Sequence, residues 1–454
     1  MEPTGISIDS GATAWVLASS ALVLLMTPGL AFFYGGLVRA KNVLGMVMQN
    51  FAAMAVVGLV WVLVGFSLAF GDGVGVVGDL RHLGLDGLDS PIAGFSGENA
   101  MVIPPIVFVG FQMMFAVITA ALITGATADR WRFGSYLVFL ALWTVLVYSP
   151  VAHWVFSPTG WAARLGALDF AGGTVVHVNA GAAALAMALV LGRRRGWPDE
   201  AMPAHNLPMT MLGAGLLWFG WIGFNAGSAL EADIIAGNAM VNTHTAAAAA
   251  LLAWVAVERV RYGKGTSLGA ASGVVAGLVA ITPAAGYVTP LSAAMIGAAA
   301  GALCALAVTV KVWLRLDDAL DVAAVHLGAG VIGSISVGLF ASAEVNAAAR
   351  DGLFYGGGYS LLGDQAITTG AVFAYSFCVT GLLGAFLGRL LGNRVGARGE
   401  DIGLDITLHG ETAYEGGTLP LPTAHPVAAP PAPAPAPARA AAWSGASGMQ
   451  QDGR

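Results

Sequence analysis

Long apolar segments follow one another along this chain and constrain its fold more than any other feature. Windows of about 20 apolar residues, enough for a helix to cross a bilayer, recur from end to end. We place eleven of them, at 12–34, 44–70, 101–124, 134–157, 169–191, 206–229, 238–258, 267–284, 291–312, 321–342 and 367–390. Charged residues make up only 10% of the chain, whereas soluble domains carry about 25%. The sequence predicts an all-α integral membrane protein with eleven transmembrane helices.

Basic residues are concentrated in alternate loops between these segments. One set of loops contains Arg39, Lys41, Arg130, Arg132, Arg193, Arg194, Arg195, Arg259, Arg261, Lys264, Arg315, Arg394 and Arg398. The opposite set contains only Arg81, Arg164 and Arg350. Loops rich in Lys and Arg stay on the cytoplasmic side. We therefore expect a multi-pass protein of the cell's inner (plasma) membrane, with its N-terminus outside and its C-terminus inside.

The composition changes after the last apolar segment. Residues 392–419 are polar and more densely charged, and residues 420–454 are rich in Pro and Ala. A segment of the latter kind cannot bury enough apolar surface to fold. We expect a transmembrane domain over 1–391, a cytoplasmic regulatory segment over 392–419 and a disordered tail over 420–454.

Two histidines lie inside apolar segments in the same short frame. His177 and His326 each stand in the pattern V-H-x-x-A-G, and Asp169 and Asp318 precede them by eight residues. The histidines fall in the fifth and tenth segments, which are matching positions if the chain consists of two five-helix units and a final helix. A second unit with an odd number of helices enters the membrane upside down, so the pattern predicts an inverted repeat.

The two histidines admit two interpretations. Ionisable groups at membrane depth are costly and usually line a pathway or the interior of a bundle. If the rings meet, one imidazole N–H can donate to the other's free nitrogen, and burial keeps both rings neutral. Alternatively, each ring packs between helices and bonds to a carbonyl or hydroxyl. The frames supply no further Cys, His or carboxylate ligands, so we expect neither a metal nor a cofactor.

Asp169 stands at the start of the fifth apolar segment. Its carboxylate is suited to cap the helix by accepting backbone N–H groups, or to favour a cation at the mouth of a pore, and the two roles are compatible. An enzyme using His and Asp as acid and base is disfavoured, because no nucleophile motif or metal triad accompanies them.

Longer motifs extend these patterns. They are Phe111-Gln112-Met113-Met114-Phe115, Asp169–Gly181, Trp218–Ser228, Ala280-Ile281-Thr282-Pro283 and Gly403–Tyr414. Through this ordered set, over nearly all of residues 12–415, the chain resembles the ammonium transporter family (Amt/Mep/Rh), and most closely its bacterial Amt channels. The resemblance implies a homotrimer in which each eleven-helix subunit has its own pore for ammonium and ammonia. Methylammonium would serve as an analogue, and no nucleic acid is implied as a partner.

The resemblance also implies roles for single residues. Phe115 and Phe224 match a stacked phenyl gate at the pore entrance. Ser228 matches a hydroxyl that accepts a hydrogen bond from ammonium, and Asp169 matches a carboxylate that shapes the outer vestibule. The pore beyond the gate would be lined by His177, His326 and Thr282.

One position departs from the family pattern. The family commonly has His-Trp-Val-Trp where this chain has His153-Trp154-Val155-Phe156. Phe156 therefore replaces the Trp usually assigned to ammonium recruitment, and a phenyl ring is a poorer cation–π partner, with such contacts contributing about 0.5–2 kcal/mol. Trp154 and Trp161 are alternative aromatic contacts for the recruited ion.

The segment 392–419 suggests regulation. We expect its carboxylates to dock on the basic loops; they are Glu400, Asp401, Asp405, Glu411 and Glu415. In the family the matching segment folds against the cytoplasmic face, where a PII-type signalling protein often plugs the pore. An ammonium sensor with the same membrane body is the alternative function, although a dedicated sensor would be expected to carry an added signalling domain.

Overall fold

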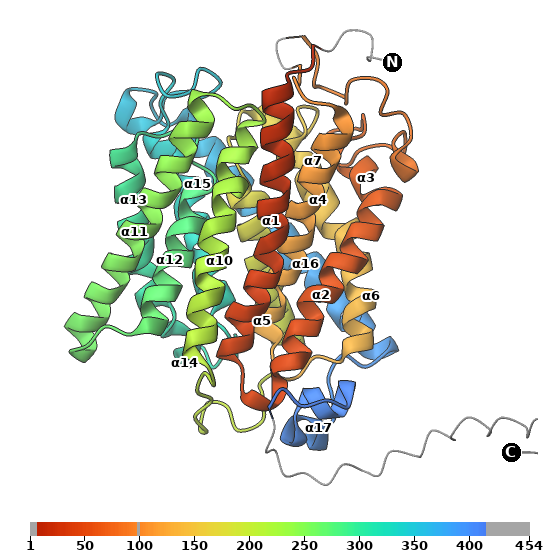
Figure 1. The fold of residues 1–454 in the computed structure, drawn as a ribbon, viewed down its shortest axis with the longest axis vertical. Coiled ribbons are helices and arrows are strands. Elements are labelled where there is room, and N and C mark those ends of the chain that lie inside the picture. Colours follow the sequence, from red (N-terminus) through yellow and green to blue (C-terminus); the bar gives the residue numbers. More distant parts are fainter. Residues whose placement is uncertain (1–6, 98–99, 415–454) are drawn as a thin grey trace, which may run out of the picture. The chain divides into compact units, whose positions relative to one another are not determined.

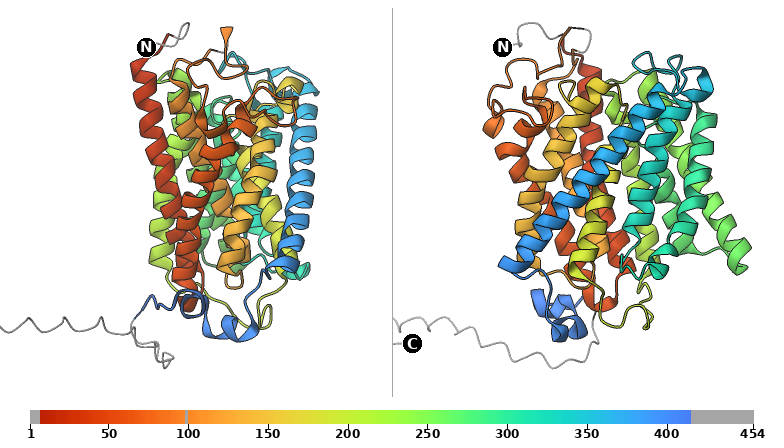
Figure 2. Two further views of the ribbon diagram at one scale, coloured as in Figure 1. Left: turned by 90° about the vertical axis from the view of Figure 1, so that its right-hand side faces the viewer. Right: turned by 180° about the vertical axis from the view of Figure 1, so that it is seen from behind.

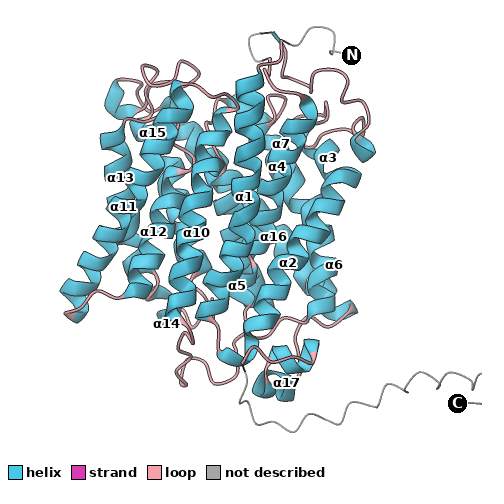
Figure 3. Cartoon of the chain, in the orientation of Figure 1, coloured by secondary structure: helices cyan, strands magenta, loops and turns pink. Residues whose placement is uncertain are grey.

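The structure is a computed structural model that describes residues 7–97 and 100–414. These residues form helices that run side by side and are joined by loops (Figures 1 and 3). No β-strand forms in this described part of the chain. The expected tail, 420–454, and Glu415 lie outside it.

Most of the chain lies in long helices. Their bounds are α1 Ser10–Leu37, α2 Val43–Val60, α4 Pro105–Leu122, α6 Phe133–Trp143, α7 Ser149–Phe156, α9 Asn179–Leu191, α10 Leu207–Ala226, α11 Ile234–Tyr262, α12 Ser267–Ile281, α13 Pro290–Ala307, α15 Ala329–Phe340 and α16 Ser360–Leu390. Shorter helices are α3 Phe66–Phe70, α5 Thr124–Thr127, α8 Trp161–Leu165, α14 Val310–Trp313 and α17 Ala397–Ile402. π-Helical turns extend several of them, at Trp61–Gly65, Thr144–Tyr148, Gly173–Val178, Ala323–Gly328 and Asp405–His409.

Ten helical segments within the described ranges are long and apolar enough to cross a membrane. They match ten of the eleven expected segments and confirm an all-helical membrane fold. The expected segment 267–284 forms α12, which has only 15 residues. Thr282, which follows its last residue, still has helical backbone angles, and the next residue, Pro283, has no backbone N–H with which to continue the helix. Eleven crossings therefore remain a prediction.

Short polar side chains fix where several helices begin. Asp9, Asn206, Asp233, Thr266 and Thr289 each accept a hydrogen bond from a backbone N–H in the first turn of the helix that follows. Such caps satisfy N–H groups that have no partner within the helix, and each stabilises it by about 1 kcal/mol.

The helices pack closely through small residues. α1 lies along α10, and α11 lies along α12 and α13. A Cβ atom on Gly277 of α12 would come within 2.5 Å of the carbonyl oxygen of Ala246 in α11, so only glycine permits this approach, as in other tightly packed membrane helices. In the right view of Figure 2, α16 crosses obliquely in front of the other helices.

The bundle has two ends, which we name by α1. The Ser10 face is the end where α1 begins, and the Leu37 face is the end where α1 finishes. Helix α17 lies at the Leu37 face (Figure 1).

The segment that contains α17 makes specific contacts at this face. Asp401 pairs with Arg195 at 2.9 Å, as the sequence predicted for docking on a basic loop. Asp405 instead accepts hydrogen bonds from the backbone N–H groups of Leu44 and Gly45, at 3.0 and 2.8 Å, at the start of α2. Its carboxylate therefore meets a helix N-terminus, where backbone donors and the helix dipole favour negative charge.

Candidate functional site

Two aspartates cap the helical turns that contain the histidines. The carboxylate of Asp169 accepts hydrogen bonds from the N–H groups of four consecutive residues, Gly172 to Val175, at 2.7 to 3.1 Å. Asp318 accepts from Val322 and Ala323 at 3.1 and 2.7 Å. In each case a π-helical turn that contains the histidine follows. The two Asp–His spacings noted in the sequence therefore correspond to two equivalent local structures.

The two histidines meet in the middle of the bundle. Nδ1 of His326 lies 3.3 Å from Nδ1 of His177, and the rings are nearly parallel, at 19°. This geometry fits two neutral imidazoles in which one nitrogen donates and the other accepts. Nε2 of His177 is buried and has no hydrogen-bond partner in the described part of the chain.

Trp221 of α10 is a further site residue, which had no expected role although it lies within the motif Trp218–Ser228. Its ring stacks on His177 with centroids 5.3 Å apart. Its indole N–H donates to the hydroxyl of Thr282 at 2.9 Å, and that hydroxyl donates to the carbonyl of Leu278. Thr282, expected to line the pore, thus orients Trp221, and Trp221 lines the space beside the histidines.

The space beside the histidines is narrow and apolar. A cavity of about 10 Å³ lies there, and its lining consists of Met26, Leu30, Phe33, Ile118, Leu122, His177, Leu217, Trp221, Phe224, Val275 and His326. This volume is near the lower limit for a single water molecule. The lining offers few polar partners besides the two imidazoles.

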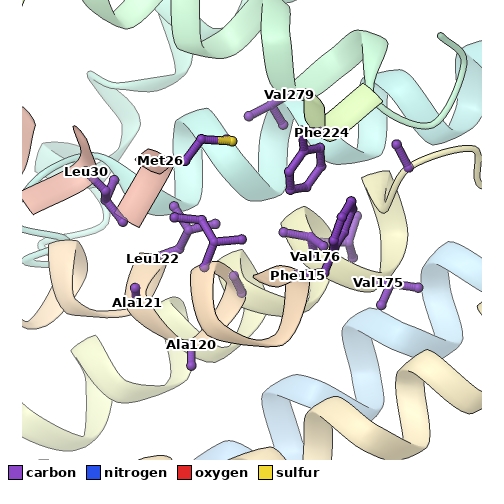
Figure 4. Packing of buried hydrophobic residues seen from close by; sticks show 14 of the residues in the cluster. Met26, Leu30, Phe115, Ala120, Ala121, Leu122, Val175, Val176, Phe224 and Val279 are labelled. Carbon is purple, nitrogen blue, oxygen red and sulfur yellow. The ribbon is translucent and has the colours of Figure 1, made fainter. Parts of the chain in front are cut away.

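Two phenyl rings close this space toward the Ser10 face. Phe115 of α4 and Phe224 of α10 stack with centroids 4.2 Å apart and an interplanar angle of 25°. Figure 4 shows the pair side by side, with Met26 and Leu122 in the same apolar cluster. Both rings are fully buried.

A wider cavity of about 270 Å³ lies beyond these rings, near the Ser10 face. Asp169, Ser228, Phe156 and Gln112 all line it. The hydroxyl of Ser228 donates to the carbonyl of Phe224 at 2.8 Å, which leaves its oxygen lone pairs available as acceptors. Gln112 is only 7% exposed, and its Oε1 has no hydrogen-bond partner in residues 7–97 and 100–414. Gln112 belongs to the motif Phe111–Phe115, in which only Phe115 had an expected role.

Trp154 lies apart from this cavity. Its indole N–H donates to the carbonyl of Val76 at 2.6 Å, and its ring packs against Trp161 and Tyr375. It is not among the residues that line the cavity, whereas Phe156, two positions later, is.

A third cavity, of about 300 Å³, lies on the other side of the histidines, toward the Leu37 face. Its lining includes His326, Glu258, Lys311 and Asp321. Nζ of Lys311 lies 2.6 Å from the carboxylate of Asp321. From the Ser10 face to the Leu37 face, the order is therefore the cavity of about 270 Å³, the phenyl pair, the narrow space of about 10 Å³ and the cavity of about 300 Å³. The histidines lie between the last two.

Comparisons with known proteins identify the family of this chain. The model of the Ammonium Transporter Family matches residues 14–414. An ammonium transporter of Mycobacterium tuberculosis is 52% identical over 432 residues, covering 90% of this chain and 91% of that protein. The crystal structure of Saccharomyces cerevisiae Mep2 is 38% identical with a TM-score of 0.82, covering 92% and 94%. A structure described as a sensor Amt protein is 31% identical with a TM-score of 0.80, covering 88% and 98%. The family match spans the helices, the histidine pair and the three cavities alike, and the chain belongs to the ammonium transporter family.

Proposed function

We propose that this protein carries ammonium across the membrane as ammonia, along a path from the Ser10-face cavity, between the phenyl rings and past the two histidines. The single observation that carries this proposal is the His177–His326 pair, at 3.3 Å, beside a narrow apolar space. The membership of the family supports ammonium transport itself, and relatives named as ammonium transporters favour a transporter over an enzyme. The route and the residue roles are our inference.

The Ser10-face cavity suits recognition of ammonium. Ammonium and potassium have similar size, but only ammonium has N–H donors. The oxygens of Ser228 and Gln112 offer acceptors for these donors, and Asp169 lies in the same lining. The face of Phe156 adds a cation–π contact of about 0.5–2 kcal/mol. Potassium would gain the charge interactions but not the directed hydrogen bonds.

The space beside the histidines then rejects ions. An isolated charge in an apolar environment is very unfavourable, so ammonium must release a proton to water in the Ser10-face cavity before it passes the phenyl rings. The resulting ammonia finds hydrogen-bond partners in two neutral imidazoles. On the Leu37 side it regains a proton, so that ammonium is restored there.

Reconstituted vesicles test this proposal directly. We expect uptake of labelled methylammonium and an ammonium-dependent flux, with no potassium flux. An ammonium-evoked current would show that the proton also crosses, and its absence would show transport of neutral ammonia. Uptake no faster than that of protein-free vesicles would contradict the proposal. An ammonium sensor is the alternative function, and it would bind ammonium without this flux; the higher identity to named transporters favours transport.

Replacing Phe156 with Trp is expected to tighten the apparent affinity for ammonium. Phe156 lines the cavity, and its ring meets Phe115 edge to face at 6.4 Å. A stronger cation–π contact of about 1.4 kcal/mol would lower the half-saturation concentration about tenfold. Concentration-dependent currents or uptake measure this change. Trp154→Phe is the matched control, since Trp154 does not line the cavity, and an equal shift in both variants would contradict the assignment.

Replacing either histidine with Leu is expected to change ion discrimination more than folding. Leu has no N–H or lone pair to offer ammonia, but it occupies a similar volume in an apolar environment. We expect altered ratios of ammonium to potassium flux in His177→Leu and His326→Leu, with thermal stability close to that of the wild type. If both ratios stay at wild-type values, the histidine pair is only structural.

The membrane arrangement is part of the proposal. We infer eleven crossings, with α12 as the eighth, an inverted five-helix repeat plus α16, and the Leu37 face in the cytoplasm of the inner membrane. Arg39, Arg130 and Arg194, all from the basic set of loops, meet at the Leu37 face, where they contact Asp129 or Asp317.

Exposed apolar side chains such as Leu252 and Leu291 suit contact with lipid or with further subunits, and we propose a homotrimer. Light scattering of the detergent-solubilised protein checks its subunit number.

The segment 392–419 is proposed to tune flux, either alone or through a cytoplasmic PII-type partner. Asp401 and Asp405 tie it to the loop after α9 and to the start of α2. Truncation after Gly392 is expected to reduce uptake because these contacts are lost, whereas truncation after Pro420 should leave uptake intact. Equal uptake by both truncated proteins, at matched expression, would rule out the regulatory role.

A further inference from the structure

The Leu37-face cavity contains a primary ammonium group that belongs to the protein itself. Nζ of Lys311 lies 2.6 Å from Oδ1 of Asp321 and donates to the carbonyl oxygen of Asp318 at 2.9 Å. Lys311 and Asp321 line the same cavity as His326. A protonated amine held by one carboxylate oxygen and one carbonyl oxygen is chemically close to an ammonium ion formed at this end of the path.

The surrounding carboxylates are already engaged. The carboxylate of Asp318 accepts the N–H groups of Val322 and Ala323. Glu258 lines the cavity together with Asp321, whereas Asp318 does not, and Glu258 accepts hydrogen bonds from the N–H and hydroxyl of Thr266 and from the indole of Trp254. Asp321 is therefore the carboxylate in this cavity whose main partner is a cation.

The backbone is arranged to present this carboxylate. Asp321 has a positive φ of 62°, and Arg315, between Lys311 and Asp321, has a φ of 50°. Residues other than glycine adopt such angles rarely. The turn brings Lys311 and Asp321 together although they are ten positions apart.

The cavities at the two ends of the path differ in the charged residues that line them. The Ser10-face cavity has Asp169 in its lining, and no Lys or Arg is among the described residues that line it. The Leu37-face cavity has Lys311 in its lining. One end is thus open to a cation from solution, and the other already holds one.

We propose that Asp321 and the carbonyl of Asp318 form a second ammonium site at the Leu37-face end of the pore, and that Lys311 occupies this site in place of the transported ion. The role in transport rests on the proposed function. With Lys311 in place, ammonium formed beside His326 is not retained, and ammonium arriving from the Leu37 side is not captured.

Removing the lysine tests the site itself. Crystals of Lys311→Met and Lys311→Gln are soaked in a thallium(I) salt, because thallium(I) resembles ammonium in charge and size and is visible by anomalous scattering. We expect a peak between Asp321 and the carbonyl of Asp318 in both variants, and none there in the wild type or in the double variant Lys311→Met/Asp321→Asn. Absence of the peak from both single variants, or its presence in the wild type, would overturn the proposal.

Flux measurements test the consequence separately. Vesicles are preloaded with unlabelled ammonium, and uptake of labelled methylammonium is measured. The half-inhibitory internal ammonium concentration is expected to fall about fivefold in Lys311→Met, equivalent to about 1 kcal/mol, and to stay near the wild-type value in Lys311→Arg, which retains the cation. Equal inhibition in all three proteins would refute the proposed effect on release. If the wild type takes up no methylammonium while thallium binds in the variants, the proposed function fails and the site stands.

Discussion

Replacing Asp169 with Ala is expected to abolish methylammonium uptake and to lower the free energy of unfolding by about 3–5 kcal/mol, because hydrogen bonds to charged groups contribute about 1.5–3 kcal/mol each and buried donors left unpaired are costly. A single helix cap would account for about 1 kcal/mol. Here one carboxylate serves four consecutive N–H groups, and the π-helical turn they belong to holds His177. Uptake in vesicles and denaturant titration in mixed micelles measure the two effects.

Asp169→Asn separates charge from shape. Asn retains one acceptor oxygen, but its amide group would face two backbone donors. We expect it to recover part of the lost stability and little of the uptake. Asp318→Ala is a second comparison, since that carboxylate serves only two N–H groups and should cost less stability. A well-folded Asp169→Ala protein with wild-type uptake would show that Asp169 has no role in transport.

The two histidine frames could be recognised in the sequence because their signal is local and repeated, but the residues alone left open whether the two rings meet. The frame V-H-x-x-A-G and the aspartate eight residues before it occur twice, and in each copy the aspartate caps a π-helical turn that contains the histidine. Hydropathy located the helices for a similar reason, since the length of an apolar segment alone decides whether it can cross a bilayer. For α12 the apolar helix has only 15 residues, so its crossing of the membrane stays a prediction.

The direction in which a side chain points was harder to predict. Trp154 and Phe156 are two residues apart on α7, and residues at that spacing lie on different sides of a helix. The sequence favoured both for ammonium recruitment, but only Phe156 lines the cavity. Thr282 similarly does not line the narrow cavity beside the histidines, but its hydroxyl accepts a hydrogen bond from Trp221, which does. Such relations depend on how helices rotate against one another, which hydropathy does not encode.

Contacts between distant segments could not be predicted from the sequence either. Asp405 was expected to pair with a basic loop, yet it meets backbone N–H groups at the start of α2. Backbone donors carry no signature in the sequence. The pairing of Lys311 with Asp321 depends on two residues with positive φ, neither of which is a glycine that would have revealed the turn.

The Leu37 face also contains a buried group of charges. Arg194 donates to the carboxylate of Asp317 at 2.7 and 2.9 Å, and it lies 3.5 Å from Asp129. Both aspartate side chains are fully buried. Burial alone would raise the pKa of Asp317, but the hydrogen bonds and charge of Arg194 hold that pKa below its ordinary value.

Replacing Arg194 with Met should therefore destabilise the protein by about 3–5 kcal/mol at neutral pH, the usual cost of leaving a buried charge without its partner. A depressed pKa in the folded state stabilises the protein above the unfolded value of about 3.9, and this stabilisation is lost as the pH falls through the folded value. The deficit of Arg194→Met should accordingly shrink as the pH approaches 4, because protonation removes the unpaired charge. Arg193→Met is the matched control, since Arg193 is exposed and forms no ion pair within the described residues. Denaturant titrations at several pH values measure both variants, and a loss that is equal for the two, or independent of pH, would contradict a stabilising role for this buried group.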